Sequence, residues 1–284
     1  MIKAYYALTK PGIIYGNALT AIGGYFLAAR GQGNMGGFLA MLIGICLVMA
    51  SGCVFNNYLD RDIDRLMKRT KNRALVTGEI SPRNALIYAT ILGVMGLGLL
   101  GLANNLLSAA LGALGLFFYG IVYGIGKRRS EHGTLLGSIS GAIPPVVGYA
   151  AYAGKLDLGA LLLFLILAAW QMPHFYAIAI YRQNDYADAG IPVLPIKRGV
   201  LATKIQILVY VIAFAVACWQ LQAQGYAGYA YLTVMTILNA AWLVLAIQGF
   251  SAPSLIPWAK RLFKFSLIVL TAFCLLASID TFLP

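Results

Sequence analysis

The chain has 284 residues, of which 61% are apolar and only 11% are charged. This charged fraction lies far below the roughly one quarter expected of a soluble domain, so the composition excludes an ordinary soluble protein and indicates an integral membrane protein. The formal net charge of +12 would suggest a nucleic-acid ligand in a soluble protein, but its distribution here indicates a topology signal and no nucleic acid as partner.

Apolar runs long enough to cross a hydrocarbon core of ~30 Å recur along the whole chain. They cover residues 12–29, 38–57, 85–103, 106–123, 134–153, 158–180, 204–222, 226–247 and 261–282. The connections at Asn104-Asn105 and at residues 222–225 are too short to hold a further domain. We therefore predict an all-α integral membrane bundle of nine transmembrane helices, which forms a single domain over residues 1–284.

The basic residues predict the orientation of this bundle in the lipid bilayer. If the N-terminus is cytoplasmic, all 21 Lys and Arg residues except Arg30 and Lys155 fall on the cytoplasmic side, as the positive-inside rule requires. The C-terminus is then expected on the opposite, periplasmic side. The nine acidic residues, except Asp157 and Asp280, fall on the same face as the cations. Because acidic residues contribute little to orientation, this shared location indicates a functional site.

The densest acidic cluster follows the second apolar span without a Gly or Pro and is therefore predicted to be helical. Residues four apart share a helix face, so Asn56, Asp60 and Asp64 form a polar stripe over two turns, whereas Asp62 points elsewhere. Such oxygen ligands suit Mg²⁺, which completes its shell with water and substrate phosphate. The alternative is that these aspartates only pair with neighbouring cations on a solvated helix end.

A second acidic segment, with Asp185 and Asp188, follows the sixth span on the same face. Two acidic helix ends on one face of a bundle could converge on one ligand, and the basic residues beside them suit a diphosphate, because Arg offers bidentate contacts and Lys a point charge. These candidates are Arg61, Lys68, Arg69, Lys71, Arg73, Lys127, Arg128, Arg182 and Lys197. For residues 127–129 a plain topology signal is the alternative.

Prolines inside two predicted spans indicate a pocket at membrane depth. Pro144-Pro145 and Pro173 should free backbone groups or kink their helices, which is tolerated where the backbone lines a cavity. His174 is the only histidine inside an apolar span, so it is a candidate ligand or acid–base group, with a satisfied buried side chain as the alternative. Close helix contacts are expected at Gly120 and Gly124, and at Gly137 and Gly141.

The segment after the second span resembles a known signature. It reads Asn56-Asn57-Tyr58-Leu59-Asp60-Arg61-Asp62-Ile63-Asp64 and is similar to the N-D-x-x-D-x-x-x-D motif of the UbiA superfamily of intramembrane prenyltransferases, with Asn57 in place of the usual Asp. The strings W-Q-M-P-H-F-Y at 170–176 and G-T-L-L-G-S-I-S-G-A-I-P-P at 133–145 resemble the branch of this superfamily that makes heme O. This similarity runs over essentially the whole chain.

The resemblance implies transfer of a farnesyl group from farnesyl diphosphate to a vinyl group of heme b (protoheme IX), with addition of water, to give heme O and diphosphate. It implies that Mg²⁺ is bound by Asn56, Asp60 and Asp64, with Asp185 from the second motif, where Tyr181 replaces the first Asp. It also implies a bacterial inner-membrane location with a cytoplasmic active face, and heme A synthase or a haem-copper oxidase as acceptor of the product. Prenylation of a quinone precursor and membrane transport are the alternative functions.

Overall fold

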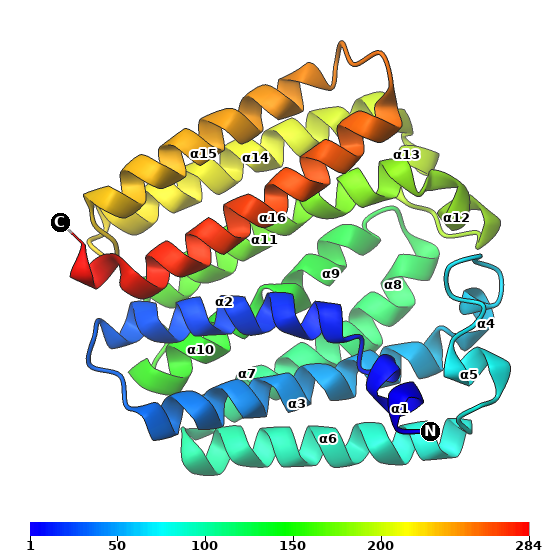
Figure 1. Cartoon of the computed structure of the whole chain (residues 1–284), viewed down its shortest axis with the longest axis horizontal. Helices are drawn as coiled ribbons and strands as arrows, with labels where there is room; N and C mark the ends of the chain where they lie inside the picture. Colours follow the sequence, from blue (N-terminus) through cyan, green and yellow to red (C-terminus); the bar gives the residue numbers. More distant parts are fainter. Residues whose placement is uncertain (284) are drawn as a thin grey trace.

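The computed structural model describes residues 1–283, and helices form all of the regular structure in that range (Figure 1). Nine helical segments of this range are long and apolar enough to cross a membrane, which confirms the predicted all-helical bundle. Six of them are single helices: α2 (Pro11–Ala29), α3 (Met35–Leu59), α6 (Pro82–Ala103), α11 (Leu158–Tyr181), α14 (Gly199–Ala223) and α15 (Tyr229–Gln248).

The other three spans are composite. The fourth span consists of α7 (Leu106–Phe117), the π-helical turn η1 (Phe118–Tyr123) and α8 (Gly124–Arg129). The fifth is divided into α9 (Gly133–Gly141) and α10 (Ile143–Ala153), and the ninth is α16 (Leu255–Ile279) followed by the 3₁₀ turn η2 (Asp280–Phe282). The break before Pro144-Pro145 confirms the expected interruption. In contrast, α11 continues through Pro173, which removes one backbone hydrogen bond without ending the helix.

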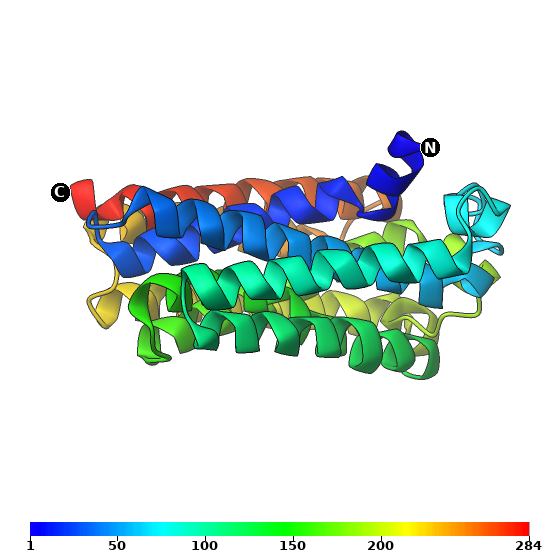
Figure 2. The ribbon, with the colours of Figure 1, turned by 90° about the horizontal axis from the view of Figure 1, so that it is seen from below.

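The short helices gather at one end of the bundle (Figure 1). They are α1 (Ile2–Leu8), α4 (Arg61–Asp64), α5 (Ala74–Thr77), α12 (Gln183–Asp188) and α13 (Leu194–Lys197). The N-terminus lies at this end and the last described residues lie at the other, as an odd number of crossings requires (Figure 1). Seen from below, the long helices run along the longest dimension of the molecule (Figure 2).

Glycines allow α2 and α10 to cross at close range. A Cβ atom added at Gly24 would lie 2.0 Å from the carbonyl oxygen of Pro145, and one added at Gly148 would lie 2.0 Å from that of Ala21. Of the expected close contacts, Gly137 lies against the ring of Tyr123, and a Cβ at Gly141 would lie 2.0 Å from Gln171 Oε1 on α11. A Cβ at Gly120, however, would meet nothing within 4 Å. The close backbone-to-backbone crossing of α2 and α10 is therefore made by glycines that the spacing motifs did not include.

Candidate active site

A cavity of about 800 Å³ lies inside the bundle, between α2, α3, η1, α9, α11 and α16. Along α3 it extends from Ile45 to Asp60, the residue that follows the end of this helix, and both residues line it. Fifteen helical residues span about 22 Å, so the cavity reaches from the end that carries the short helices deep into the membrane-spanning region. Apolar side chains line the deep part, and charged side chains gather at the short-helix end.

Asn56, Asp60 and Asp64 all line this cavity, with exposed fractions of 2%, 7% and 3%. The expected continuous helix is interrupted, because α3 ends at Leu59 and α4 begins only after Asp60. Two hydrogen bonds of helical spacing bridge this interruption, from Asp60 N to Asn56 O (2.9 Å) and from Asp64 N to Asp60 O (2.8 Å). The three residues therefore stay on one side, whereas the side chain of Asp62 is 64% exposed.

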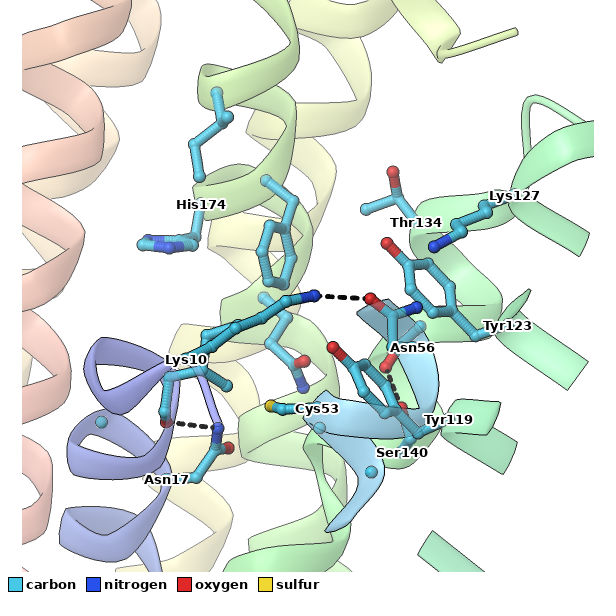
Figure 3. Close-up of a pocket in the computed structure, with 18 of the residues that line it drawn as sticks. Lys10, Asn17, Cys53, Asn56, Tyr119, Tyr123, Lys127, Thr134, Ser140 and His174 are labelled. Atoms are coloured by element: carbon cyan, nitrogen blue, oxygen red, sulfur yellow. Dashed lines mark hydrogen bonds between the residues drawn. The ribbon is translucent and has the colours of Figure 1, made fainter. Parts of the chain in front are cut away.

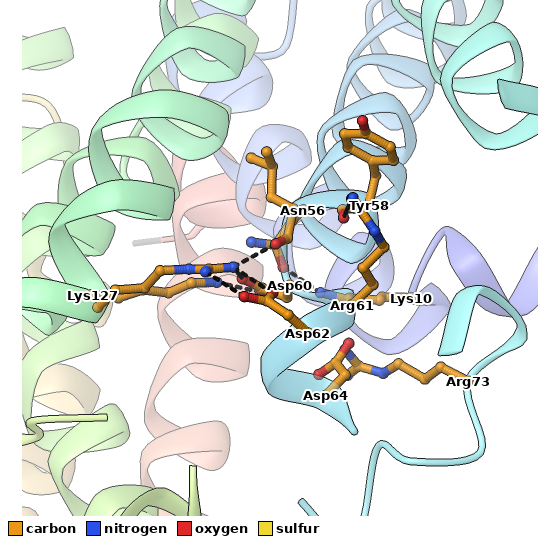
Figure 4. Close-up of polar contacts among 11 residues, drawn as sticks. Lys10, Asn56, Tyr58, Asp60, Arg61, Asp62, Asp64, Arg73 and Lys127 are labelled. Atoms are coloured by element: carbon orange, nitrogen blue, oxygen red, sulfur yellow. Dashed lines mark hydrogen bonds and ion pairs between the residues drawn. The ribbon is translucent and has the colours of Figure 1, made fainter. Parts of the chain in front are cut away.

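Each residue of this polar stripe has a cation from elsewhere in the chain as its partner (Figure 4). Lys10 Nζ donates to Asn56 Oδ1 at 2.6 Å, and Arg73 Nη1 lies 2.6 Å from Asp64 Oδ2. The ammonium of Lys127 pairs with Asp60 Oδ2. The second oxygen, Oδ1 of Asp60, is buried and accepts no hydrogen bond from the described residues, although Arg128 Nη2 lies 3.5 Å away.

Lys10 is the residue of this site that the sequence analysis treated only as a topology signal. It precedes Pro11, the first residue of α2, and its φ of 53° is left-handed, which is uncommon for a residue other than glycine. This backbone conformation accompanies a side chain that enters the cavity toward Asn56 (Figure 3). Burial lowers the pKa of Lys10 to about 8.

Two stacked tyrosines from η1 form part of the cavity wall (Figure 3). The ring centroids of Tyr119 and Tyr123 are 5.7 Å apart, and Lys127 Nζ lies 4.9 Å from the centre of the Tyr123 ring. Single π-helical turns are frequently found at functional sites. The sequence analysis missed these residues, because a regular helical period gives no sign of where a π turn changes the direction of side chains.

His174 lines the cavity from α11, on the far side of the drawn pocket from Tyr123 and Lys127 (Figure 3). Its Nδ1 atom lies 2.8 Å from Ser266 Oγ on α16, and its ring stacks on Trp170 with centroids 4.6 Å apart. The histidine therefore has a hydrogen-bond partner and also faces the cavity.

The structure divides the predicted diphosphate-binding cations into two groups. Arg69, Arg73, Lys127 and Arg182 line the cavity. Arg61 does not, because its guanidinium lies over the Tyr58 ring at 4.5 Å, and Arg128 does not, because it pairs with the exposed Asp62. Lys68, Lys71 and Lys197 are exposed and also lie outside the cavity lining.

Asp185 lies outside this cavity, contrary to the expectation that the two acidic segments converge. It lines a second hollow of about 730 Å³ between the end of α11 and residues 253–260, and its Oδ2 lies 3.4 Å from Arg182 Nη1. The reason is that α11 ends at Tyr181 and the chain turns at Arg182 before α12 begins. Tyr186 lines the main cavity instead, and burial raises its pKa to about 12.

The donor atoms of the polar stripe fit a hard cation whose coordination is completed by other ligands. No group of three or more His, Cys, Asp or Glu side chains among residues 1–283 is arranged to hold a metal ion. Mg²⁺, however, is usually bound by one or two carboxylates together with water and substrate phosphate. Asn56, Asp60 and Asp64 offer such oxygens, and the buried Oδ1 of Asp60 has a lone pair without a hydrogen bond.

The sequence model of the UbiA prenyltransferase family matches residues 17–268. The chain belongs to the UbiA prenyltransferase family. It is 53% identical over 286 residues to the protoheme IX farnesyltransferase of Sodalis glossinidius (strain morsitans), an alignment that covers 100% of this chain and 96% of that relative. It is 51% identical over 281 residues to the protoheme IX farnesyltransferase of Yersinia pseudotuberculosis serotype O:1b (strain IP 31758), covering 99% and 95%. These matches confirm the resemblance to the heme O branch.

Solved structures of other proteins share the fold. A digeranylgeranylglyceryl phosphate synthase superposes with a TM-score of 0.80 at 21% identity, over 98% of each chain. A UbiA homologue from Archaeoglobus fulgidus, bound to GPP and Mg²⁺, superposes with a TM-score of 0.67 at 18% identity, over 97% of this chain and 99% of that one. At these identities the likeness shows the arrangement of the helices alone.

Proposed function

We propose that this prenyltransferase transfers the farnesyl group of farnesyl diphosphate to a vinyl group of heme b and that addition of water completes heme O. The relatives that match over the full length are protoheme IX farnesyltransferases. The structural observation that supports this function best is the cavity itself, which joins a charged end to a deep apolar part. Farnesyl diphosphate likewise has a charged diphosphate and an apolar chain. A porphyrin ring is largely apolar and therefore suits the deep part.

The charged end suits the leaving group. Lys10, Arg73 and Lys127 bring their cationic groups to the cavity from three separate elements. As the allylic C1–O bond breaks, its electron pair goes to the diphosphate. Preorganised cations stabilise this developing negative charge without reorganisation of water. Arg69 and Arg182, which also line the cavity, can provide bidentate contacts to phosphate oxygens.

We assign Mg²⁺ to Asn56, Asp60 and Asp64, with no contribution from Asp185 to this site, because Asp185 lies outside the cavity lining. The Archaeoglobus fulgidus homologue, bound to GPP and Mg²⁺, supports a metal in this family. When bound, the metal would neutralise charge on the diphosphate and favour its departure. The cations that now pair with the stripe, Lys10, Arg73 and Lys127, would then lie within reach of the same diphosphate.

The deep part of the cavity suits the carbon chemistry. Departure of diphosphate leaves a farnesyl cation, which the faces of Tyr119 and Tyr123 can stabilise by cation–π attraction. The terminal vinyl carbon of the haem then donates its electron pair to C1, and a cation forms on the carbon next to the porphyrin. Water adds there and loses a proton, which gives the hydroxyethylfarnesyl substituent. The apolar wall of the cavity would exclude bulk water from the farnesyl cation.

The whole chain forms one catalytic domain over residues 1–284 in this proposal. The positive-inside rule predicts that the short-helix end faces the cytoplasm, because the basic residues gather there. The bacterial inner membrane is the location that the similarity to bacterial protoheme IX farnesyltransferases implies. Farnesyl diphosphate then reaches the site from the cytoplasmic face of the bilayer. Heme A synthase or a haem-copper oxidase would take up the product.

The test is mass spectrometry of porphyrins after purified protein is incubated with heme b, farnesyl diphosphate and Mg²⁺, with a chelator as control. We expect a metal-dependent haem product heavier by one farnesyl group and one hydroxyl group, because the added water loses a proton. If folded protein gives no haem product, aromatic quinone precursors are the next acceptors to test. Prenylation of such a precursor, with heme b unchanged, would replace the proposed acceptor and leave the prenyl transfer in place.

A further inference from the structure

We infer that Nε2 of His174 binds the iron of the porphyrin substrate, and that Ser266 holds the ring in the tautomer that this requires. The inference rests on the proposed function, because it states how the haem acceptor is held. It assigns an iron ligand on α11 and a positioning residue on α16, neither of which belongs to the polar stripe.

The hydroxyl of Ser266 determines which ring nitrogen of His174 carries the proton. Ser266 Oγ lies 2.7 Å from the carbonyl oxygen of Phe263 and 2.8 Å from His174 Nδ1. A carbonyl oxygen can only accept, so the single hydroxyl proton of Ser266 is used in the bond to Phe263. The Oγ atom must then accept from Nδ1, which therefore carries the proton. Nε2 is left as the nitrogen with the free lone pair.

The Nε2 atom of His174 is free to bind a ligand in the cavity. This atom makes no hydrogen bond within residues 1–283, yet it is not among the polar side-chain atoms of that range that are sealed by protein. His174 itself lines the cavity. The small exposed fraction of the residue, 8%, is thus consistent with a ring whose free nitrogen faces the cavity. A neutral imidazole nitrogen in this state is the usual protein ligand of haem iron.

Contacts with aromatic side chains and with α16 hold the ring of His174 in a fixed orientation. It stacks on Trp170 at 27° and lies 4.8 Å from the ring of Phe263, centroid to centroid. Trp170 Nε1 in turn donates to the backbone oxygen of Ser266 at 2.8 Å. A metal-binding histidine typically gives its other N–H to a partner that fixes its orientation, and the contacts to α16 have this form.

The depth of His174 also suits a porphyrin. It lies seven residues before the end of α11 at Tyr181, which corresponds to about 10 Å along the helix axis. The nearby cavity wall is formed by Trp170, Phe175 and Leu267. Iron bound here would hold the apolar porphyrin ring in the apolar part of the cavity, away from the carboxylates of the stripe.

The experiment compares ferric haem b with metal-free protoporphyrin IX as ligands of the purified full-length protein, by absorption and fluorescence titration without farnesyl diphosphate. If iron is ligated, wild type should bind haem at least roughly tenfold more tightly than the metal-free porphyrin. In His174→Ala this ratio should fall to near one, the Soret band should shift, and added imidazole should restore the wild-type spectrum. His132→Ala is the matched control, because His132 is the only other histidine and lies exposed before α9.

Ser266 is tested by a pair of variants. Ser266→Ala removes the acceptor for Nδ1–H and should weaken haem binding by roughly tenfold with a changed spectrum. Ser266→Thr retains the hydroxyl and should restore both. If His174→Ala elutes as an aggregate on size exclusion, His174→Gln replaces it, since glutamine keeps the volume of the side chain and is not expected to give the imidazole spectrum.

The outcomes separate the inference from the proposed function. If wild type converts heme b to a farnesylated product while the haem spectrum and the binding ratio are the same in His174→Ala, the inference is wrong and the function stands. If wild type shows a His174-dependent haem spectrum but gives no farnesylated haem, ligation stands and the proposed reaction fails. If wild type does not distinguish haem from the metal-free porphyrin, iron ligation is excluded.

Discussion

Three oxygen-bearing side chains are paired with three cations at the charged end of the cavity. Asn56, Asp60 and Asp64 are buried there at spacings of four residues. Buried polar and charged side chains are stable only when they are paired, and the partners of Asn56 and Asp60 come from sequence positions far from the stripe. The third partner, Arg73, belongs to the loop that follows α4.

Asp60→Asn should reduce formation of the haem product by about 100-fold or more, because it removes the charge that holds the metal and orients Lys127. The bundle should remain folded, since Asn keeps the volume of Asp and an oxygen that accepts from Lys127. Asp62→Asn is the matched control, because its side chain is 64% exposed and lies outside the cavity lining. Product is quantified by mass spectrometry, and folding by size exclusion and thermal melting. Turnover of Asp60→Asn at the level of Asp62→Asn would disprove the metal assignment.

Lys10→Met should raise the stability of the substrate-free protein while it weakens the use of farnesyl diphosphate. Burial lowers the pKa of Lys10 from 10.5 to about 8, so its charge at neutral pH costs the folded state about 3 kcal/mol. Methionine removes that cost but also the cation that would contact diphosphate. We expect a higher melting temperature together with a higher KM for farnesyl diphosphate. Lys3→Met, at an exposed position, should change neither, and an unchanged KM in Lys10→Met would exclude a diphosphate contact.

At the scale of single residues, the sequence predicts the polar stripe, because a spacing of four places Asn56, Asp60 and Asp64 on one face of a helix. It does not predict which cations join them. Arg61 lies within the motif and Arg73 lies nine residues after it, yet Arg61 lies over Tyr58 while Arg73 reaches Asp64. Lys10 contacts a residue 46 positions away. Such partners depend on how the helices pack, which a local pattern does not contain.

At the scale of helices, composition predicts where the chain is interrupted better than where helices touch. The break before Pro144 was expected from the loss of backbone donors. The crossing of α2 and α10 was not, because Gly24 and Gly148 lie in different helices and form no spacing motif within either one. The π turn η1 was also missed, although it orients two of the tyrosines of the cavity.

Gly24→Ala should destabilise the bundle by about 1–3 kcal/mol, because the added methyl group would overlap the backbone of Pro145 and force α2 away from α10. Gly98→Ala on α6 is the control. A Cβ there meets nothing within 4 Å, and the better helix propensity of Ala should stabilise that helix by up to about 1 kcal/mol. Thermal melting of both variants in detergent provides the measurement. Equal melting temperatures would show that the crossing tolerates expansion.

For the whole molecule, hydropathy predicts the nine spans, and the distribution of charge predicts their orientation. The number of spans is confirmed in the described part of the chain, and the orientation stays a prediction. The sequence predicts only in part which residues of the two acidic segments meet in one site. Both acidic segments lie at the same end of the bundle (Figure 1). A shared end did not bring Asp185 into the cavity, however, because the turn at Arg182 directs it to the other hollow.

Reporter fusions test the orientation. Alkaline phosphatase fused to the full-length chain should be active, because the C-terminus is expected in the periplasm, and green fluorescent protein at the same position should be dark. A fusion after Gln248, at the end of α15, removes the ninth span and should reverse both results. The opposite pattern would place the charged end of the cavity outside the cytoplasm, where farnesyl diphosphate is not expected to arrive.

The ion pairs at the charged end should determine whether the metal and the diphosphate bind separately or together. Asp60 and Asp64 already hold a lysine and an arginine as counterions. A divalent cation that arrived alone would have to displace these two positive groups, and a diphosphate that arrived alone would have to compete with two carboxylates for them. A metal–diphosphate salt avoids both costs by a double exchange, in which the carboxylates take the metal and the freed cations take the anion. The site should therefore be selective for the salt over either of its ions, and each ion should strengthen the binding of the other by the same factor.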